Sequence, residues 1–133
     1  HPNNCAFGSN KEKFKIYLKP QDTWNSIVTN ESWGVDPNKF EYINIETVDD
    51  FIKQNQINTI DILKTDTEGF DLEVLKSNDW DKFNPKIVIA ECLTARLSDI
   101  HSDPVALYLK SLNYFIYAKT GYSIIFMKNE NSH

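Results

Sequence analysis

Residues 60–76 read IDILKTDTEGFDLEVLK, and this stretch is the most informative part of the sequence. Its first five residues, Ile60–Lys64, form a short and mostly apolar run, which is typical of a strand. Asp66 and Glu68 follow two positions apart, so on an extended strand end their side chains can project to the same side. Gly69 lets the backbone turn into the next element. The stretch therefore predicts a strand, then an acidic turn, then a helix.

The rest of the second half of the chain continues this alternation. The helix after the acidic turn is expected to begin near Glu68 and to bury an apolar stripe. A continuous apolar run predicts a central strand, a proline predicts the first turn of a helix, and a glycine between two strands predicts a hairpin. These features are the stripe of Leu72, Val74 and Leu75, the strand Ile87–Ala90, the helix from Pro104, and the hairpin strands Tyr114–Ala118 and Ser123–Met127.

The first half of the chain has strand-like patterns on both sides of an irregular segment. Lys13–Leu18 alternates lysines with apolar residues, which predicts a half-buried strand with a solvated outer face. Phe40–Glu46 alternates as well, and Thr47 is suited to cap a helix that follows it. Between the two strands we expect a long surface loop over residues 19–39, which contains Trp24.

Alternating strands and helices predict an α/β domain with a parallel sheet and helices on its faces. Its 133 residues amount to one small domain, 1–133. In such sheets, ligands bind beyond the carboxyl ends of the strands. Asp66 and Glu68 follow one strand, and Glu91 follows the next, so these acids mark the expected site.

Composition excludes several classes of protein. The net charge is −5, and the chain has no long basic run, which argues against a nucleic-acid partner. No apolar run approaches the roughly 20 residues of a membrane span. Cys5 and Cys92 are distant from each other and form no CxxC motif, so we expect free thiols in a reducing, cytoplasmic setting.

The acidic turn also has a simpler interpretation. Acids at a helix N-terminus are favoured by the helix dipole alone, and Asp71 and Glu73 continue the acidic run. A calcium loop of the EF-hand type does not fit, because its glycine stands at a different spacing from the acids. A non-catalytic carbohydrate-recognition module remains the alternative to an enzyme, since loop tryptophans and carboxylates both suit sugars.

Several blocks of the sequence resemble one known family. Residues 64–69, KTDTEG, followed by LEVLK at 72–76, resemble the K-x-D-x-E-G…LEVLK signature of the FkbM family of methyltransferases. The block TVDDFI at 47–52 looks like a helix start of that family, and IVIAE at 87–91 looks like its next strand. Residues 4–18 look like its third strand and the hairpin after it. Together the blocks cover roughly residues 4 to 128 in the family's order.

The resemblance implies an S-adenosylmethionine-dependent O-methyltransferase that acts on a hydroxyl of a sugar, a polyketide or a similar small molecule or glycan. It implies a Rossmann-like sheet, here truncated at its N-terminal side and ending in an antiparallel hairpin. The family's cofactor loop contains glycine, whereas no two of the four glycines of this chain lie close together. We therefore expect the chain to hold the acceptor side of the domain and to be inactive alone.

The resemblance and the strand-end position also suggest residue roles. Asp66 is the first candidate for the general base or for positioning the acceptor, because it lies nearest the carboxyl end of its strand, and Glu68 is the second. The remaining candidates are Glu91, His101 and Trp24 for the substrate and Ala6, together with Asp66, for the cofactor. We predict no metal ligand, because two acids at this spacing are common.

A final expectation concerns association between chains. In the family's sheet, the strand that ends at Asp66 has a neighbour on each side, and one of these neighbours is missing from this sequence. The strand around Ile62 would then be an apolar edge, which attracts other chains. We expect self-association through this edge.

Overall fold

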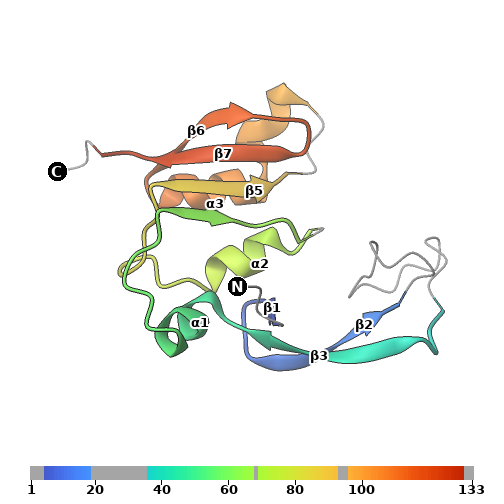
Figure 1. Cartoon of the computed structure of the whole chain (residues 1–133). Helices are drawn as coiled ribbons and strands as arrows, with labels where there is room; N and C mark the ends of the chain where they lie inside the picture. The colour runs from blue at the N-terminus through green and yellow to red at the C-terminus, as the bar shows by residue number, and fades with distance from the viewer. Residues whose placement is uncertain (1–4, 19–35, 68, 93–95, 131–133) are drawn as a thin grey trace.

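The computed structural model describes residues 5–18, 36–67, 69–92 and 96–130. These residues form a small α/β structure with two separate sheets, one of three strands and one of four. Figure 1 shows the four-stranded sheet and α3 at one side of the molecule, the three-stranded sheet at the other, and α2 between them. The elements are β1 (Ala6–Phe7), β2 (Glu12–Tyr17), β3 (Phe40–Glu46), α1 (Val48–Gln54), β4 (Ile62–Lys64), α2 (Asp71–Lys76), β5 (Ile87–Glu91), the 3-10 helix η3 (Leu97–Ser102), α3 (Pro104–Ser111), β6 (Tyr114–Lys119) and β7 (Ser123–Lys128).

The four-stranded sheet has the strand order β4-β5-β7-β6. β4 runs parallel to β5, with Ile62 opposite Ile87, whereas β7 is antiparallel to both of its neighbours. The predicted apolar run is thus a central strand, and the predicted hairpin is present as β6 and β7. The sheet is mixed rather than parallel, because the short turn between β6 and β7 can join only antiparallel strands.

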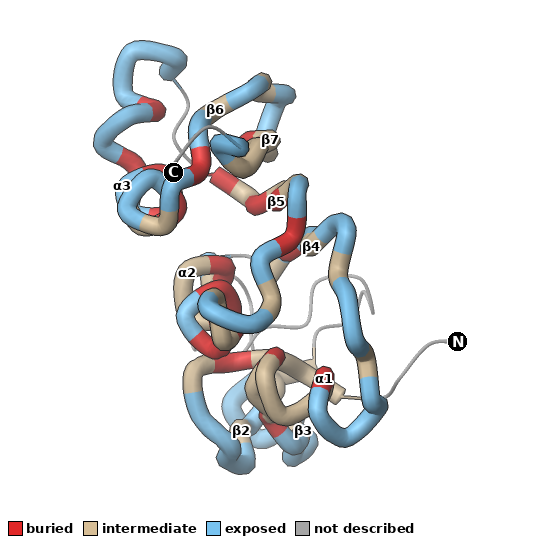
Figure 2. The backbone as a smooth tube through the Cα atoms, turned by 90° about the vertical axis from the view of Figure 1, so that its left-hand side faces the viewer, coloured by how far each residue is buried: buried red, intermediate tan, exposed pale blue. Residues whose placement is uncertain are grey.

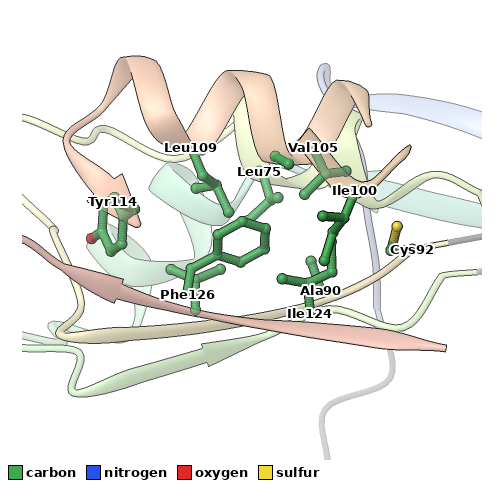
Figure 3. Packing of buried hydrophobic residues seen from close by; sticks show 11 residues of the cluster. Leu75, Ala90, Cys92, Ile100, Val105, Leu109, Tyr114, Ile124 and Phe126 are labelled. Atoms are coloured by element: carbon green, nitrogen blue, oxygen red, sulfur yellow. The ribbon is translucent and has the colours of Figure 1, made fainter. Parts of the chain in front are cut away.

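Helices α2 and α3 pack on one face of this sheet and build the main core. Alternate residues of β5 and β7 point to this face and are fully buried, as expected from the two-residue period of a strand. Figure 3 shows the Phe126 ring between the helices and the sheet, with Leu75 of α2 and Leu109 of α3 beside it. The buried members of the core are Leu75, Val88, Ala90, Cys92, Ile100, Val105, Ala106, Leu109, Tyr114, Ile124 and Phe126.

The opposite face of the sheet and the outer edge of β4 are less covered. Ile87 and Ile89 of β5 point to this face and are only partly buried. Ile62 is 56% exposed, although it is apolar and lies in a strand. Within the described part of the chain, β4 pairs with β5 alone, so its other edge is open, as the sequence predicted.

The three-stranded sheet has the order β1-β3-β2. β3 pairs in parallel with β1 and in antiparallel register with β2, where Phe14 lies opposite Ile43. Phe14 and Ile16 are partly buried, while Lys13 and Lys15 are exposed, which confirms the predicted two-faced strand. Gly8 packs closely against β3, because a Cβ at this position would lie 2.8 Å from a methyl carbon of Ile45.

α1 and α2 connect the two sheets through a second, smaller core. Thr47 caps α1, accepting a hydrogen bond from the Asp50 backbone N–H at 3.1 Å, as predicted. Val48 and Ile52 of α1 pack with Val74 of α2. Figure 2 shows buried segments, in red, in both α1 and α2. The second core therefore fixes α2, and with it the acidic turn, between the two sheets.

Two of the sequence-based expectations differ from the structure, and a third falls mostly on residues that the structure does not describe. α2 begins at Asp71 rather than near Glu68, because Gly69 and Phe70 lie in the turn that precedes the helix. A single parallel sheet was expected, whereas the strands divide into two sheets. The expected loop 19–39 lies outside the described residues except for positions 36–39, which contain a turn.

Candidate functional site

The turn after β4 is organised by one buried carboxylate, that of Asp71. This side chain is 3% exposed and accepts hydrogen bonds from the hydroxyl groups of Thr65 and Thr67. It also accepts the backbone N–H of Thr67 at 3.2 Å and that of Glu91, at the end of β5, at 3.0 Å. Gly69 completes the turn with a φ of +99°, a conformation that favours glycine. Asp71 thus joins the ends of β4 and β5 to the start of α2.

This arrangement explains how an acid is tolerated in the core. A buried carboxylate is costly unless hydrogen-bond donors replace its water. Four donors do so here, and Asp71 also lies in the first turn of a helix, where a negative charge is favoured. Asp71 is therefore a structural acid that fixes the position of the Glu91 backbone.

A second buried acid, Asp103, caps α3. Its carboxylate accepts the backbone N–H groups of Val105 at 2.9 Å and Ala106 at 3.3 Å. The Cys92 thiol donates to its other oxygen at 2.9 Å. Asp103 therefore connects α3 to the residue that directly follows β5, and Figure 3 shows Cys92 at that end of the core.

These two acids and Glu91 border one hollow, which we call the acidic pocket. It has a volume of about 470 Å³ and lies beyond the carboxyl end of β5, between the starts of α2 and α3. Glu91 is partly buried and lines the pocket, while its backbone is held by Asp71. The lining residues are Gly69, Asp71, Leu72, Glu91, Asp103, Pro104 and Val105.

The predicted site residues fall into different places. Glu91 lines the acidic pocket, and its role toward the substrate stays a prediction. Asp66 is exposed at the turn, pairs with Lys64 at 2.9 Å and is absent from the pocket lining. His101 lies in η3 and borders another cavity, and Ala6 lies in the other sheet, opposite Ile45. Glu68 and Trp24 lie outside the described residues, so their predicted roles stay predictions.

Asp71 and Asp103 also line the pocket, although the sequence did not single them out as candidate site residues. A signal existed for Asp103, since an Asp before a proline is a common helix start. No such signal singled out Asp71 within its acidic run, because its burial depends on a contact with Glu91 twenty positions away.

Two other kinds of chemistry have little support in the described residues. No group of three or more His, Cys, Asp or Glu side chains in these parts of the chain is placed to hold a metal ion. Burial and the nearby Glu46 carboxylate raise the pKa of Cys5, which disfavours the reactive thiolate.

No helix in the described ranges is long and apolar enough to cross a membrane.

Comparison with known proteins gives one finding. The family model of the methyltransferase FkbM domain matches residues 2–116, which is most of the chain. The chain belongs to the FkbM methyltransferase family. No curated protein and no solved structure matches it. The FkbM assignment confirms the resemblance of the KTDTEG and LEVLK blocks and supports a methyltransferase-type enzyme.

Proposed function

We propose that this FkbM domain catalyses S-adenosylmethionine-dependent O-methylation of a hydroxyl on a sugar, a polyketide or a similar small molecule or glycan. The observation that carries the proposal is the acidic pocket at the carboxyl end of β5, in a chain of a methyltransferase family. Carboxylates at such a position suit a hydroxyl-bearing substrate, since they accept its hydrogen bonds and can take up its proton.

The pocket lining suits the charge of this cofactor, whose sulfonium is a cation. Asp71, Glu91 and Asp103 supply negative charge, while Leu72 and Val105 offer apolar contact for a methyl group. S-Adenosylmethionine supplies the transferable methyl group when bound. By the family resemblance, Ala6 and Asp66 would contribute to holding it, although neither residue lines the acidic pocket. The four glycines of the chain do not include the close pair that the family's cofactor loop uses.

The roles of the acids follow from their surroundings. Glu91 borders the pocket on a backbone fixed by Asp71, so it is suited to orient an acceptor hydroxyl. A carboxylate at the strand end would take up the proton of the acceptor hydroxyl, and the cofactor would supply the methyl group to that oxygen. Asp66 stays the first candidate for that base, although its ion pair with Lys64 and its exposure make it a weaker choice than its position in the sequence suggested.

Paired variants of Asp66 and Glu91 test this proposal. The assay uses the natural polypeptide that carries this sequence, methyl-labelled S-adenosylmethionine and a panel of sugars and polyols, and it measures label transfer. Loss of a general base typically lowers turnover about 10²-fold or more, so Asp66→Asn should do so if Asp66 is the base. Glu91→Gln should mainly raise the KM of the acceptor. The matched control is Asp61→Asn, because Asp61 is exposed and outside the pocket lining.

Each outcome bears on a different part of the proposal: the base, the acceptor site or the type of acceptor. Asp66→Asn with normal turnover removes Asp66 as the base, and a large loss of turnover in Glu91→Gln transfers that role to Glu91. Normal kinetics in Glu91→Gln, whose residue lines the pocket, would overturn the assignment of the acidic pocket as the acceptor site. No label transfer to any hydroxyl compound, with transfer to amines or thiols instead, would overturn O-methylation.

A further inference from the structure

A second cavity lies on the other side of α3 from its cap, and nothing in the methyl-transfer proposal uses it. It has a volume of about 350 Å³ and is bordered by η3, by α3 and by the start of β6. We call it the cationic pocket. Its lining consists of His101, Ala106, Lys110, Asn113, Tyr114, Phe115, Ile116, Phe126 and Asn129.

The floor of the cationic pocket is part of the main core. Ala106 and Phe126 are buried, and Ile116 packs against the same cluster. Phe115, at 44% exposure, adds a large apolar side chain to the lining. The pocket is therefore a rigid apolar recess, and an aromatic or aliphatic ring bound there would be removed from water.

The polar lining of this recess has only one sign of charge. Its one charged side chain is Lys110, and it contains no Asp or Glu, although the whole chain carries a net charge of −5. Lys110 lies in the last turn of α3 and is exposed. No ion pair or hydrogen bond within the described ranges engages its ammonium group. A cation is thus available beside an apolar recess, with amide side chains of two asparagines also in the lining.

We propose that the cationic pocket binds a small organic anion, namely an apolar ring that carries one carboxylate. The ring packs on Ile116 and Phe126, and the carboxylate pairs with the Lys110 ammonium at the rim. The combination selects this class, because a free inorganic anion gains nothing from the apolar floor and a neutral ring gains nothing from Lys110. The site is separate from the acidic pocket, whose lining shares no residue with it.

Titration with benzoate tests the proposal on the 133-residue chain. Backbone amide NMR signals are followed while benzoate is added, and the neutral amide benzamide is titrated in parallel. We expect saturable shifts centred on Ala106, Phe115 and Asn129, with benzoate binding more tightly than benzamide. Lys110→Gln should weaken benzoate binding about two- to fivefold, the range for an ion pair with an exposed side chain, and should leave benzamide binding unchanged.

A matched control separates the pocket from general charge. Lys86 is exposed and lies outside the pocket, so Lys86→Gln removes the same charge without touching the recess. Its benzoate affinity should equal that of the unmodified chain. Three results would overturn the proposal: benzoate shifts that do not saturate, benzamide binding as tight as that of benzoate, or an equal loss of affinity in Lys86→Gln and Lys110→Gln.

Discussion

The acidic pocket and the cationic pocket lie along the same helix, α3, and have opposite charges for different reasons. Two of the three acids of the acidic pocket are buried and hydrogen-bonded to backbone N–H groups, so the fold itself depends on them. The charges of the cationic pocket belong to exposed side chains without such contacts in the described residues. The charged lining of the acidic pocket therefore stabilises the fold, whereas the charged lining of the cationic pocket does not.

Asp71→Ala should have the largest effect on stability. It leaves the Thr65 hydroxyl and the N–H groups of Thr67 and Glu91 without their acceptor, and each buried unpaired group costs about 1–3 kcal/mol. We expect the free energy of unfolding to fall by about 3–5 kcal/mol in urea denaturation. Asp61→Ala removes an exposed carboxylate and should change stability little. If Asp71→Ala and Asp61→Ala lowered the free energy of unfolding equally, Asp71 would contribute no more to the fold than an exposed acid does.

Tyr114 should give an intermediate effect that depends on pH. It lines the cationic pocket, but its hydroxyl is used by the fold, donating to the Pro85 carbonyl at 2.6 Å. Burial raises the pKa of Tyr114 from 10.0 to about 12. Between these values the folded chain keeps a proton that the unfolded chain releases, so stability is full below pH 10 and falls as the pH rises to 12.

The measurement for Tyr114 is the free energy of unfolding as a function of alkaline pH. Tyr114→Phe cannot ionise, so its slope above pH 10 should be smaller than that of the unmodified chain. Tyr108, whose pKa burial also raises, contributes to both curves and cancels in the comparison. Identical slopes would show that the Tyr114 hydroxyl is not protected in the folded chain.

Lys110→Gln should have the smallest effect on stability. The side chain is exposed and makes no ion pair in the described part of the chain, so the expected change is within about 0.5 kcal/mol in the same urea experiment. A loss of more than about 1 kcal/mol would mean that the fold uses this charge as it uses Asp71.

Much of the fold was predictable because its signals are local. Phe40–Glu46 has a strand-like pattern of apolar and polar residues and is β3 without any shift of its ends. The Thr47 cap and the hairpin of β6 and β7 also depend on neighbouring residues alone. The division into two sheets was not predictable in this way, because strand pairing across the chain is decided by tertiary contacts rather than by the pattern of one strand.

The candidate site was predictable only as a region. The end of β5 does border a pocket, through Glu91, whereas the end of β4 contributes no lining residue. Which acid of the run Asp66, Asp71 and Glu73 is buried depends on donors supplied from other segments, so spacing alone did not identify Asp71. His101 was a candidate for the substrate, whereas it lies in η3 and lines the cationic pocket rather than the acidic pocket.

The open edge of β4 has a consequence for symmetry. We propose that two chains pair through it in antiparallel register, which relates them by a two-fold axis and joins two four-stranded sheets into one. Such pairing uses the same strand on both chains, so it closes at the dimer and leaves no further β4 edge to extend a fibre. Light scattering should then give twice 15.4 kDa at high concentration, and Ile62→Lys, which places a charge on the edge, should restore the single chain. A single-chain mass at every concentration would instead mean that the edge is covered within one chain.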